Sequence, residues 1–462
     1  MNCELKLDHI QKVFFLGIGG IGMSALARYF HHIGKEVLGY DKTESALTKK
    51  LVSEGMQVHY IDDVSLIPEK IDLVVYTPAI PDTLEEMVTL SASGLPMMKR
   101  SEVLGLLSIE KKTIAIAGTH GKTTTCSILS YILKECGVDA NAFVGGIMKN
   151  YDSNFLLGNS DWIVVEADEY DRSFHRLFPD IAVVLAMDPD HLDIYGDRHK
   201  MLLAYRQFTM QVSPGGRLFI HNTAADYMDA EWERELRSKQ IEVLRYGYSD
   251  ADYRYDKLKY HRGVFSFDFV SPKQRIEELE IVLPGVHNVS NTTVAIAVAE
   301  DIGADMNVLK TKLKDFAGIK RRFEFIGMND DHILIDDYAH HPEELSAAIR
   351  TAKTLFPDRK LTVAFQPHLF SRTNDFAAEF GAVLSLADEV ILTHIYPARE
   401  LPTAGVTSRL IYDNIGHDKK EIIDKSDLST IIKNKEIEVL LILGAGDIDK
   451  EISNIKEILF SE

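Results

Sequence analysis

The chain has 462 residues, more than one hydrophobic core usually covers, so we expect two or three domains. Its 45% hydrophobic and 26% charged residues are ordinary values for a globular protein. The formal net charge of −19, without any basic run, argues against nucleic acid and anionic membranes as partners. Three cysteines lack metal-binding spacing, and no apolar run reaches the roughly 18 residues of a membrane span, so we expect a cytoplasmic protein.

The first part of the chain alternates predicted strands and helices. Apolar runs predict strands over residues 12–16, 36–39 and 73–76, and apolar periodicity predicts a helix over residues 25–33. This alternation is typical of a parallel α/β domain. We expect that domain to end near residue 108.

A glycine-rich loop follows the first predicted strand. Gly17, Gly19 and Gly22 have the G-x-G-x-x-G spacing between a strand and a helix, and Asp41 ends the next strand about 20 residues later. This turn is the fingerprint of a dinucleotide site, but any nucleotide diphosphate can use it. NAD and a UDP-sugar therefore both stay open here, and a tight turn without a ligand is the structural alternative.

A second loop of the same kind follows the apolar strand predicted over residues 114–117. It contains Gly118, Gly121, Lys122 and Thr123, with three threonines leading into a helix predicted to include residues 126–134. Backbone N–H groups of such a loop bind phosphate, the lysine adds a cation, and Thr123 can bind Mg²⁺. We expect ATP or GTP, although the spacing departs from the standard P-loop and a turn with an exposed lysine is the alternative.

Two later apolar strands end in polar clusters. The strand beginning at Trp162 ends at Glu166, with Asp168 and Glu169 close behind, and the strand over residues 181–186 is followed by His191. Carboxylates near a phosphate loop are needed to bind Mg²⁺, so Glu166 is the first candidate. His191 is a candidate for a second metal ion or for orienting a phosphate, whereas solvated loop residues are the alternative for all of these side chains.

Residues after 282 begin a helix and then a third α/β segment. Asn288, at the start of an Ala/Val/Ile-rich helix, can contact adenine or cap the helix. Beyond residue 318, strands predicted over residues 333–335, 361–365, 390–393 and 439–443 each lead into a polar loop. This pattern predicts a second Rossmann-like domain with one functional edge. Its candidate site residues are Arg322, Asp337, Tyr338, His340, His368 and Arg372.

Taken together, these segments resemble the Mur ligase family, the ATP-dependent amide-forming enzymes of peptidoglycan synthesis. The resemblance spans residues 17–447 in family order. The segments that carry it are Gly17 to Ser24, Gly118 to Thr125, Glu166 to Glu169, Asp190 to Asp193, His287-Asn288, Arg321 to Glu324, Asp337 to Pro342, Phe365 to His368 and Tyr396-Pro397.

The resemblance implies three α/β domains and a reaction. The domains are an N-terminal Rossmann-like UDP-binding domain over residues 1–108, a central P-loop ATPase domain over residues 109–318, and a C-terminal Rossmann-like domain over residues 319–462. Within the family, the chain is most similar to enzymes that join L-alanine to UDP-N-acetylmuramate with ATP and Mg²⁺. We expect a monomer or homodimer that binds no nucleic acid and no membrane.

The resemblance also assigns residues to roles. The UDP-substrate would contact the first loop, which comprises Gly17, Gly19, Gly20, Ile21, Gly22, Met23 and Ser24. ATP would contact Gly118, Thr119, His120, Gly121, Lys122, Thr123, Thr124, Asn288, Arg322 and Asp337. Magnesium would be held by Thr123, Glu166 and His191. The reacting groups and the amino acid would be contacted by Lys122, Glu166, His191, Arg322, Tyr338, His340, His368 and Arg372.

Three other functions compete with this interpretation. A recycling ligase of the same family would attach a preformed murein tripeptide to the same UDP-sugar. An NAD-dependent oxidoreductase would use the first loop with Asp41, and would bind reduced cofactor without Mg²⁺. A nucleotide-binding switch would bind ATP without substrate-dependent turnover.

Overall fold

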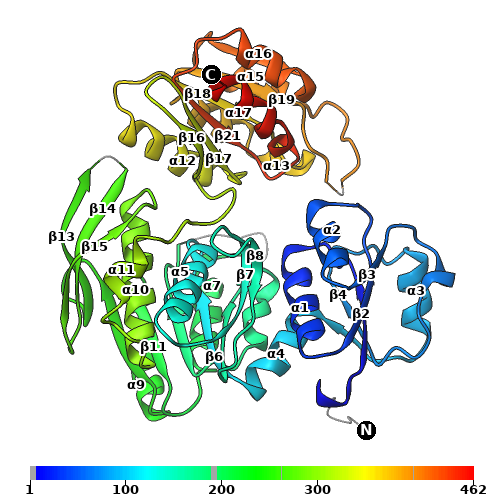
Figure 1. Cartoon of the computed structure of the whole chain (residues 1–462), viewed down its shortest axis with the longest axis vertical. Helices are drawn as coiled ribbons and strands as arrows, with labels where there is room; N and C mark the ends of the chain where they lie inside the picture. Colours follow the sequence, from blue (N-terminus) through cyan, green and yellow to red (C-terminus); the bar gives the residue numbers. More distant parts are fainter. Residues whose placement is uncertain (1–6, 189–194, 262, 399, 462) are drawn as a thin grey trace. The chain divides into compact units, whose positions relative to one another are not determined.

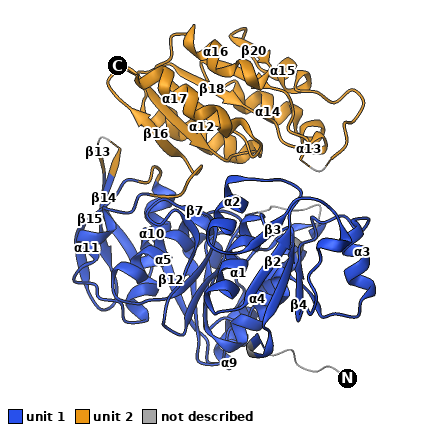
Figure 2. Ribbon diagram, turned by 45° about the vertical axis from the view of Figure 1, so that its right-hand side comes forward, with its two compact units in different colours: residues 1–259, 265–282, 286–317 blue, residues 260–264, 283–285, 318–462 orange. Residues whose placement is uncertain are grey.

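A computed structural model describes residues 7–188, 195–261, 263–398 and 400–461 of the chain. Three sheets lie in two compact units (Figures 1 and 2). The first unit comprises residues 1–259, 265–282 and 286–317, and the second comprises residues 260–264, 283–285 and 318–462. Each sheet belongs to one α/β domain, so the predicted three-domain α/β class is confirmed. No helix in the described ranges is long and apolar enough to cross a membrane.

The first sheet is fully parallel, with strand order β3-β2-β1-β4-β5. Its strands are β1 (Lys12–Leu16), β2 (Glu36–Tyr40), β3 (Gln57–His59), β4 (Leu73–Tyr76) and β5 (Met97–Lys99), and its helices are α1 (Ile21–His32), α2 (Ala46–Ser53), α3 (Glu85–Ala92) and α4 (Arg100–Glu110). Strand order reverses beside β1, which is where a parallel sheet opens a crevice for ligands. The first glycine loop follows β1 and therefore lies at this crevice.

The second sheet has the order β15-β14-β13-β12-β11-β10-β6-β9-β7-β8, and β6 pairs in parallel with both β9 and β10. Its strands are β6 (Lys112–Ala117), β7 (Asn141–Met148), β8 (Ser153–Leu156), β9 (Trp162–Glu166), β10 (Ile181–Val184), β11 (Arg217–His221), β12 (Glu242–Gly247), β13 (Tyr253–His261), β14 (Val264–Val270) and β15 (Arg275–Ile281). The accompanying helices are α5 (Lys122–Glu135), α7 (Arg198–Thr209), α8 (Asn222–Ala225), α9 (Ala230–Ser238), α10 (Val286–Asp301) and α11 (Leu309–Leu313). Helix α5 packs on α10 and on the strands around β6 (Figure 1).

The first two sheets share one hydrophobic core. Helix α1 is buried along most of its length, because it packs on its own sheet and also on β7 and β8 of the second sheet. Tyr29 of α1 contacts Phe143 and Phe155 of this hairpin, with ring centroids 5.6 and 6.2 Å apart. A shared core on this scale explains why the two sheets form one compact unit.

The third sheet has the order β16-β17-β21-β18-β19-β20, with only β16 antiparallel to its neighbour. Its strands are β16 (Glu324–Met328), β17 (Ile333–Asp337), β18 (Leu361–Phe365), β19 (Glu389–Thr393), β20 (Lys420–Ile423) and β21 (Val439–Leu443), and its helices are α12 (Pro342–Leu355), α13 (Phe370–Asp375), α14 (Ala377–Leu384), α15 (Arg409–Asn414), α16 (Leu428–Lys433) and α17 (Ile452–Phe460). Ile333 and Ile335 pack with α12, α14 and α15, whereas Leu334 packs with α16 and α17. Both faces are therefore covered, which agrees with strands that are apolar along their whole length.

Two helix starts differ from the sequence prediction. Helix α1 begins at Ile21 instead of residue 25, and α5 begins at Lys122 instead of residue 126. The first turn of α5 consists of Lys122 and three threonines, and that of α1 places Ile21 and Met23 between glycine and serine, so neither turn shows the apolar periodicity on which the prediction rested. Helix α4 runs through residue 108, where we expected the first domain to end.

Candidate active site

The phosphate loop connects β6 to α5 at the carboxyl edge of the second sheet. Gly118 has φ +140°, and a Cβ at this position would lie 2.8 Å from the Cβ of Leu185 and 2.9 Å from the backbone nitrogen of Ala186. Gly121 precedes α5 with φ +83° and lies against the Asn291 side chain. Both positions therefore need glycine, because a side chain would push the loop away from β10 and α10.

Lys122 lies in the first turn of α5 and forms a buried ion pair. Its ammonium donates to both carboxylate oxygens of Glu169 at 2.7 Å and to the Gly118 carbonyl at 2.8 Å. The side chains of Lys122 and Glu169 are 16% and 1% exposed. Burial alone disfavours the ammonium, but the carboxylates of Glu169 and Asp168 outweigh it and raise the pKa of Lys122. Lys122 is therefore a cation held against the loop by Glu169 and the Gly118 carbonyl.

Glu166 ends β9 and faces the start of α5. Its Oε2 accepts a hydrogen bond from the Thr123 hydroxyl at 3.1 Å, and its Oε1 accepts one from the Gly145 amide of β7. A Cβ at Gly145 would lie 2.7 Å from Glu166 Oε1, so only glycine allows this approach. The two oxygen groups predicted to bind magnesium thus lie next to each other.

The start of α10 lies behind the phosphate loop. Asn291 donates to Asn288 Oδ1 at 3.2 Å, and the same Asn291 side chain packs on Gly121. His287 lies close enough to His120 of the loop for the two rings to interact electrostatically, and burial is the main cause of the lowered pKa of His287. Asn288 is therefore linked to the phosphate loop through Asn291, one helical turn further along α10.

The first glycine loop is held by backbone contacts and by Asp41. Gly17 has φ +85° and its amide donates to the Tyr40 carbonyl at 2.8 Å. Asp41 Oδ2 accepts from the Gly19 amide at 2.8 Å, and its other oxygen accepts from the Thr43 amide at 3.1 Å. Asp41 thus holds the loop through two backbone N–H groups, whereas the NAD alternative would have used its carboxylate to bind a ribose.

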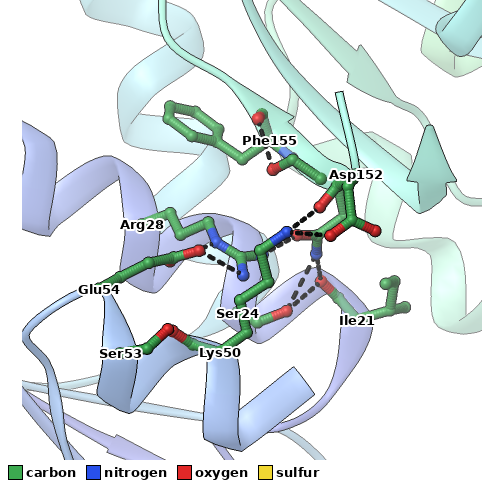
Figure 3. A network of polar contacts seen from close by, with 10 residues as sticks. Ile21, Ser24, Arg28, Lys50, Ser53, Glu54, Asp152 and Phe155 are labelled. Atoms are coloured by element: carbon green, nitrogen blue, oxygen red, sulfur yellow. Dashed lines mark hydrogen bonds and ion pairs between the residues drawn. The ribbon is translucent and has the colours of Figure 1, made fainter. Parts of the chain in front are cut away.

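A buried polar network attaches this loop to the second sheet (Figure 3). Asn154 of β8 donates to the carbonyl of Ile21 and to the hydroxyl of Ser24 in the first turn of α1. Its Oδ1 accepts from the buried guanidinium of Arg28, which also pairs with Glu54 at 2.7 Å. The β7–β8 hairpin therefore contacts the metal candidate Glu166 through Gly145 and the first glycine loop through Asn154.

The third sheet gathers a separate cluster at its carboxyl edge. The ring centroids of His340 and His368 are 5.9 Å apart, and His368 stacks on Tyr396 at 5.8 Å. Burial is the main cause of the lowered pKa of His340; Arg372 and Arg322 add to it, whereas Glu344 opposes it. The histidine therefore favours its neutral form.

Acidic and basic groups surround this cluster. Burial raises the pKa of Asp337 to about 6, although Arg322 and two backbone N–H groups oppose the shift. The guanidinium groups of Arg321 and Arg322 lie 5.1 and 5.8 Å from the ring of Tyr338. Leu369, beside His368, has φ +71°, a strained value for a residue with a side chain. The arrangement is typical of a site that binds a charged ligand.

Comparisons with known proteins match all three sheets. Three sequence profiles cover the chain: "Mur ligase family, catalytic domain" over residues 12–112, "Mur ligase middle domain" over residues 116–299, and "Mur ligase, glutamate ligase domain" over residues 321–446. The chain belongs to the Mur ligase family.

Curated relatives of this Mur ligase are similar over almost their whole length. The chain is 42% identical to the "UDP-N-acetylmuramate--L-alanine ligase" of Christiangramia forsetii, covering 99% of both chains. It is 45% identical to the protein of the same name from Parabacteroides distasonis, covering 98% of both.

Solved structures of the family give the same picture. The UDP-N-acetylmuramate-alanine ligase of Thermotoga maritima is 28% identical and has a TM-score of 0.81, with 98% of this chain and 100% of that chain covered. A murein peptide ligase from Psychrobacter arcticus, 22% identical with a TM-score of 0.72, covers 98% of this chain and 99% of its own, and shows the shared fold.

The predicted site residues of this Mur ligase fall into groups. The structure brings Gly118, Gly121, Lys122, Thr123 and Glu166 together at one edge of the second sheet. It gathers Arg322, Asp337, Tyr338, His340, His368 and Arg372 at the third sheet. His191, predicted as a metal ligand, lies outside the described residues.

Several residues that contact the candidate groups were not predicted from the sequence. Gly145 is one such residue, and the strand that holds it, β7, was not predicted; its adjacent glycines, 145 and 146, are the signal that could have indicated close backbone approach. Asn291 is another, and its i,i+3 spacing from Asn288, which places both on one helix face, is the signal that could have found it. Arg100 gave no signal by spacing, because its neighbours come from other elements.

Proposed function

We propose that this Mur ligase joins L-alanine to the carboxylate of UDP-N-acetylmuramate while converting ATP to ADP and phosphate, which makes UDP-N-acetylmuramoyl-L-alanine for peptidoglycan. The observation that carries this proposal is the 42–45% identity, over 97% or more of this chain, to relatives that bear the name of this activity. We place the reaction in the cytoplasm, where ATP and UDP-sugars are available.

We propose that the work is divided among residues 1–108, 109–318 and 319–462. In the first domain, the loop of Gly17, Gly19, Gly20, Ile21, Gly22, Met23 and Ser24 would bind the UDP diphosphate through its backbone N–H groups. Both oxygens of Asp41 accept backbone N–H groups, which favours UDP over an NAD site in which Asp41 would bind a ribose.

ATP fits the loop of the second sheet. Gly118, Thr119, His120, Gly121, Lys122, Thr123 and Thr124 would surround its phosphates, and Asn288 would contact its adenine. Helix α5 has no side-chain cap and no acidic residue in its first turn, so its N-terminal amides face an anion without competition from its own chain. The buried Thr119 hydroxyl has no hydrogen-bond partner within the described ranges, as expected of a group that binds a ligand.

Magnesium fits the oxygen donors of Thr123 and Glu166, with His191 proposed as a further ligand. Mg²⁺ binds oxygen ligands, and most of its coordination sites are usually taken by phosphate oxygens and water. A cluster of three acidic or histidine side chains is therefore not required. Among the described residues there is no such cluster. When bound, the ion would neutralise charge on the phosphate oxygens.

The proposed chemistry has two steps. An oxygen of the muramate carboxylate attacks the γ-phosphorus of ATP, the bond to the bridging oxygen breaks, and ADP leaves. The amine of L-alanine then attacks the acyl carbon, the bond to the phosphate oxygen breaks, and the amine loses a proton as phosphate leaves. Lys122 and the loop amides would stabilise charge on the transferring group.

The cluster of the third sheet would complete nucleotide and amino-acid binding. Arg322 and Asp337 are proposed to contact the nucleotide, and His340, His368, Arg372 and Tyr338 to contact the reacting groups and L-alanine. A neutral His340, favoured by its lowered pKa, can accept a proton from the attacking amine.

Phosphate release from ATP tests the proposal directly. With UDP-N-acetylmuramate present, we expect release and amide product with L-alanine, and neither with no amine. Phosphate release with the murein tripeptide in place of L-alanine would identify the protein as the recycling ligase instead. Release with no acceptor amine, or none at all, would refute ligase activity.

A further inference from the structure

We propose that Arg100 binds the UDP-substrate on the phosphate that is bonded to the sugar. This inference rests on the proposed function and adds a residue to its substrate site. It comes from the place of Arg100 between the first glycine loop and the acidic end of β9.

Arg100 lies directly against the first turn of α1. It is the first residue of α4, and a Cβ built on Gly22 would lie only 2.7 Å from its Nη1 and 3.1 Å from its Cζ. Gly22 is the third glycine of the G-x-G-x-x-G spacing. Because Gly22 has no side chain, the Arg100 guanidinium can lie beside the amides that begin α1.

Arg100 differs from two arginines of the same unit that have carboxylate partners. Arg28 pairs with Glu54 at 2.7 Å, and Arg176 pairs with Glu102 at 3.5 Å. Arg100 is half-buried, yet no acidic side chain in the described part of the chain pairs with it. A partly desolvated guanidinium gains most from an anionic partner, and planar guanidinium groups match phosphate oxygens well. The missing partner is therefore expected to be a ligand.

The start of α1 offers the complementary anion site. Gly20 precedes α1 without a side-chain cap, and the first turn contains no acidic residue. In contrast, α2, α7 and α9 are capped by the side chains of Ser45, Asp197 and Asp229. The first amides of α1 thus remain available to a phosphate, with the Arg100 guanidinium beside them.

The direction of the substrate decides which phosphate Arg100 contacts. Arg100 lines one depression together with Glu166 and Asp168, at the edge where Thr123 meets Glu166. The muramate carboxylate has to reach the Glu166 side to meet the transferring phosphoryl group. The substrate therefore runs from the glycine loop past Arg100, and the phosphate next to the sugar is the one nearest to the guanidinium.

Binding of UDP and UMP separates this role from general support of the fold. UMP lacks the phosphate that Arg100 would contact, so the UDP-to-UMP affinity ratio measures that contact. We expect Arg100→Ala to lower the ratio about tenfold or more, as for a charge-assisted hydrogen bond. Arg100→Lys should lower the ratio less, because a lysine ammonium can still pair with the phosphate. Arg176→Ala, which removes a nearby arginine that already has a carboxylate partner, should leave the ratio unchanged.

Steady-state kinetics give a second readout. The KM for UDP-N-acetylmuramate should rise about tenfold or more in Arg100→Ala, whereas the KM for ATP should stay within about twofold. An unchanged UDP-to-UMP ratio in a folded Arg100→Ala or Arg100→Lys protein would overturn the inference. Failure of the wild-type chain to bind UDP or to form amide would instead overturn the proposed function.

Discussion

Replacing Asn154 by alanine tests whether the β7–β8 hairpin fixes the first glycine loop. Asn154 is 0% exposed and makes three polar contacts, as donor to the Ile21 carbonyl and the Ser24 hydroxyl and as acceptor from Arg28. Figure 3 shows Ile21, Ser24, Arg28 and Glu54 of this network. Alanine removes all three contacts without disturbing the Arg28–Glu54 ion pair.

The magnitude follows from burial and charge. Each of the two neutral hydrogen bonds contributes about 1 kcal/mol, and a buried charged donor that loses an acceptor costs about 2 kcal/mol. Ser24 keeps its own hydrogen bond to the Ile21 carbonyl, which reduces the loss. We therefore expect Asn154→Ala to destabilise the first unit by about 3 kcal/mol.

Denaturant unfolding and hydrogen exchange measure this effect. The amides in the first half of α1 should exchange faster, and the KM for the UDP-substrate should rise while the KM for ATP does not. Asn159→Ala is the matched control, because Asn159 is exposed and its side chain bonds to Asp139, in the turn between α5 and β7, rather than to α1. If the two variants were equally stable and exchanged equally in α1, the attachment argument would be wrong.

Three further predictions concern the phosphate loop and the third sheet. Lys122→Ala should lower turnover about 10²-fold or more if its charge contributes about 3 kcal/mol. The double variant Lys122→Ala/Glu169→Gln should regain stability, because it removes the unpaired buried carboxylate, but it should not regain turnover. Full turnover in either variant would exclude charge stabilisation by Lys122. Gly118→Ala should abolish nucleotide binding because its Cβ would meet Leu185 and Ala186, which directly follow β10. Gly137→Ala, with φ +86° and open space, should cost only about 1 kcal/mol of stability. Burial raises the pKa of Asp336 from its ordinary 3.8 to about 7, so the folded state binds the proton more tightly and stability falls as pH rises between these values. Asp336→Asn should therefore gain roughly 2–3 kcal/mol relative to the wild type between pH 5 and pH 8 in denaturant titrations, and parallel pH profiles would contradict this.

The sequence by itself determined the local architecture of this Mur ligase. The strands predicted over residues 12–16, 73–76, 361–365 and 439–443 have the predicted bounds, because buried parallel strands are short apolar runs with polar ends. The glycines of the two loops, and the lysine that follows the second, were also visible, since their backbone conformations and chemistry leave few substitutes. These features depend on neighbours along the chain.

Only the tertiary structure decided which distant residues complete the site. Glu169 pairs with Lys122, Gly145 donates to Glu166, Arg100 lies over Gly22, and Asn154 joins the hairpin to α1, although each pair is separated by 21 to 133 residues along the chain. No local pattern encodes such pairs, because they arise from strand order and from the way α1 packs between two sheets. Hydrophobic periodicity and turn residues thus determine the individual strands, helices and loops, whereas the partners of the charged groups depend on which strand ends the sheets bring together.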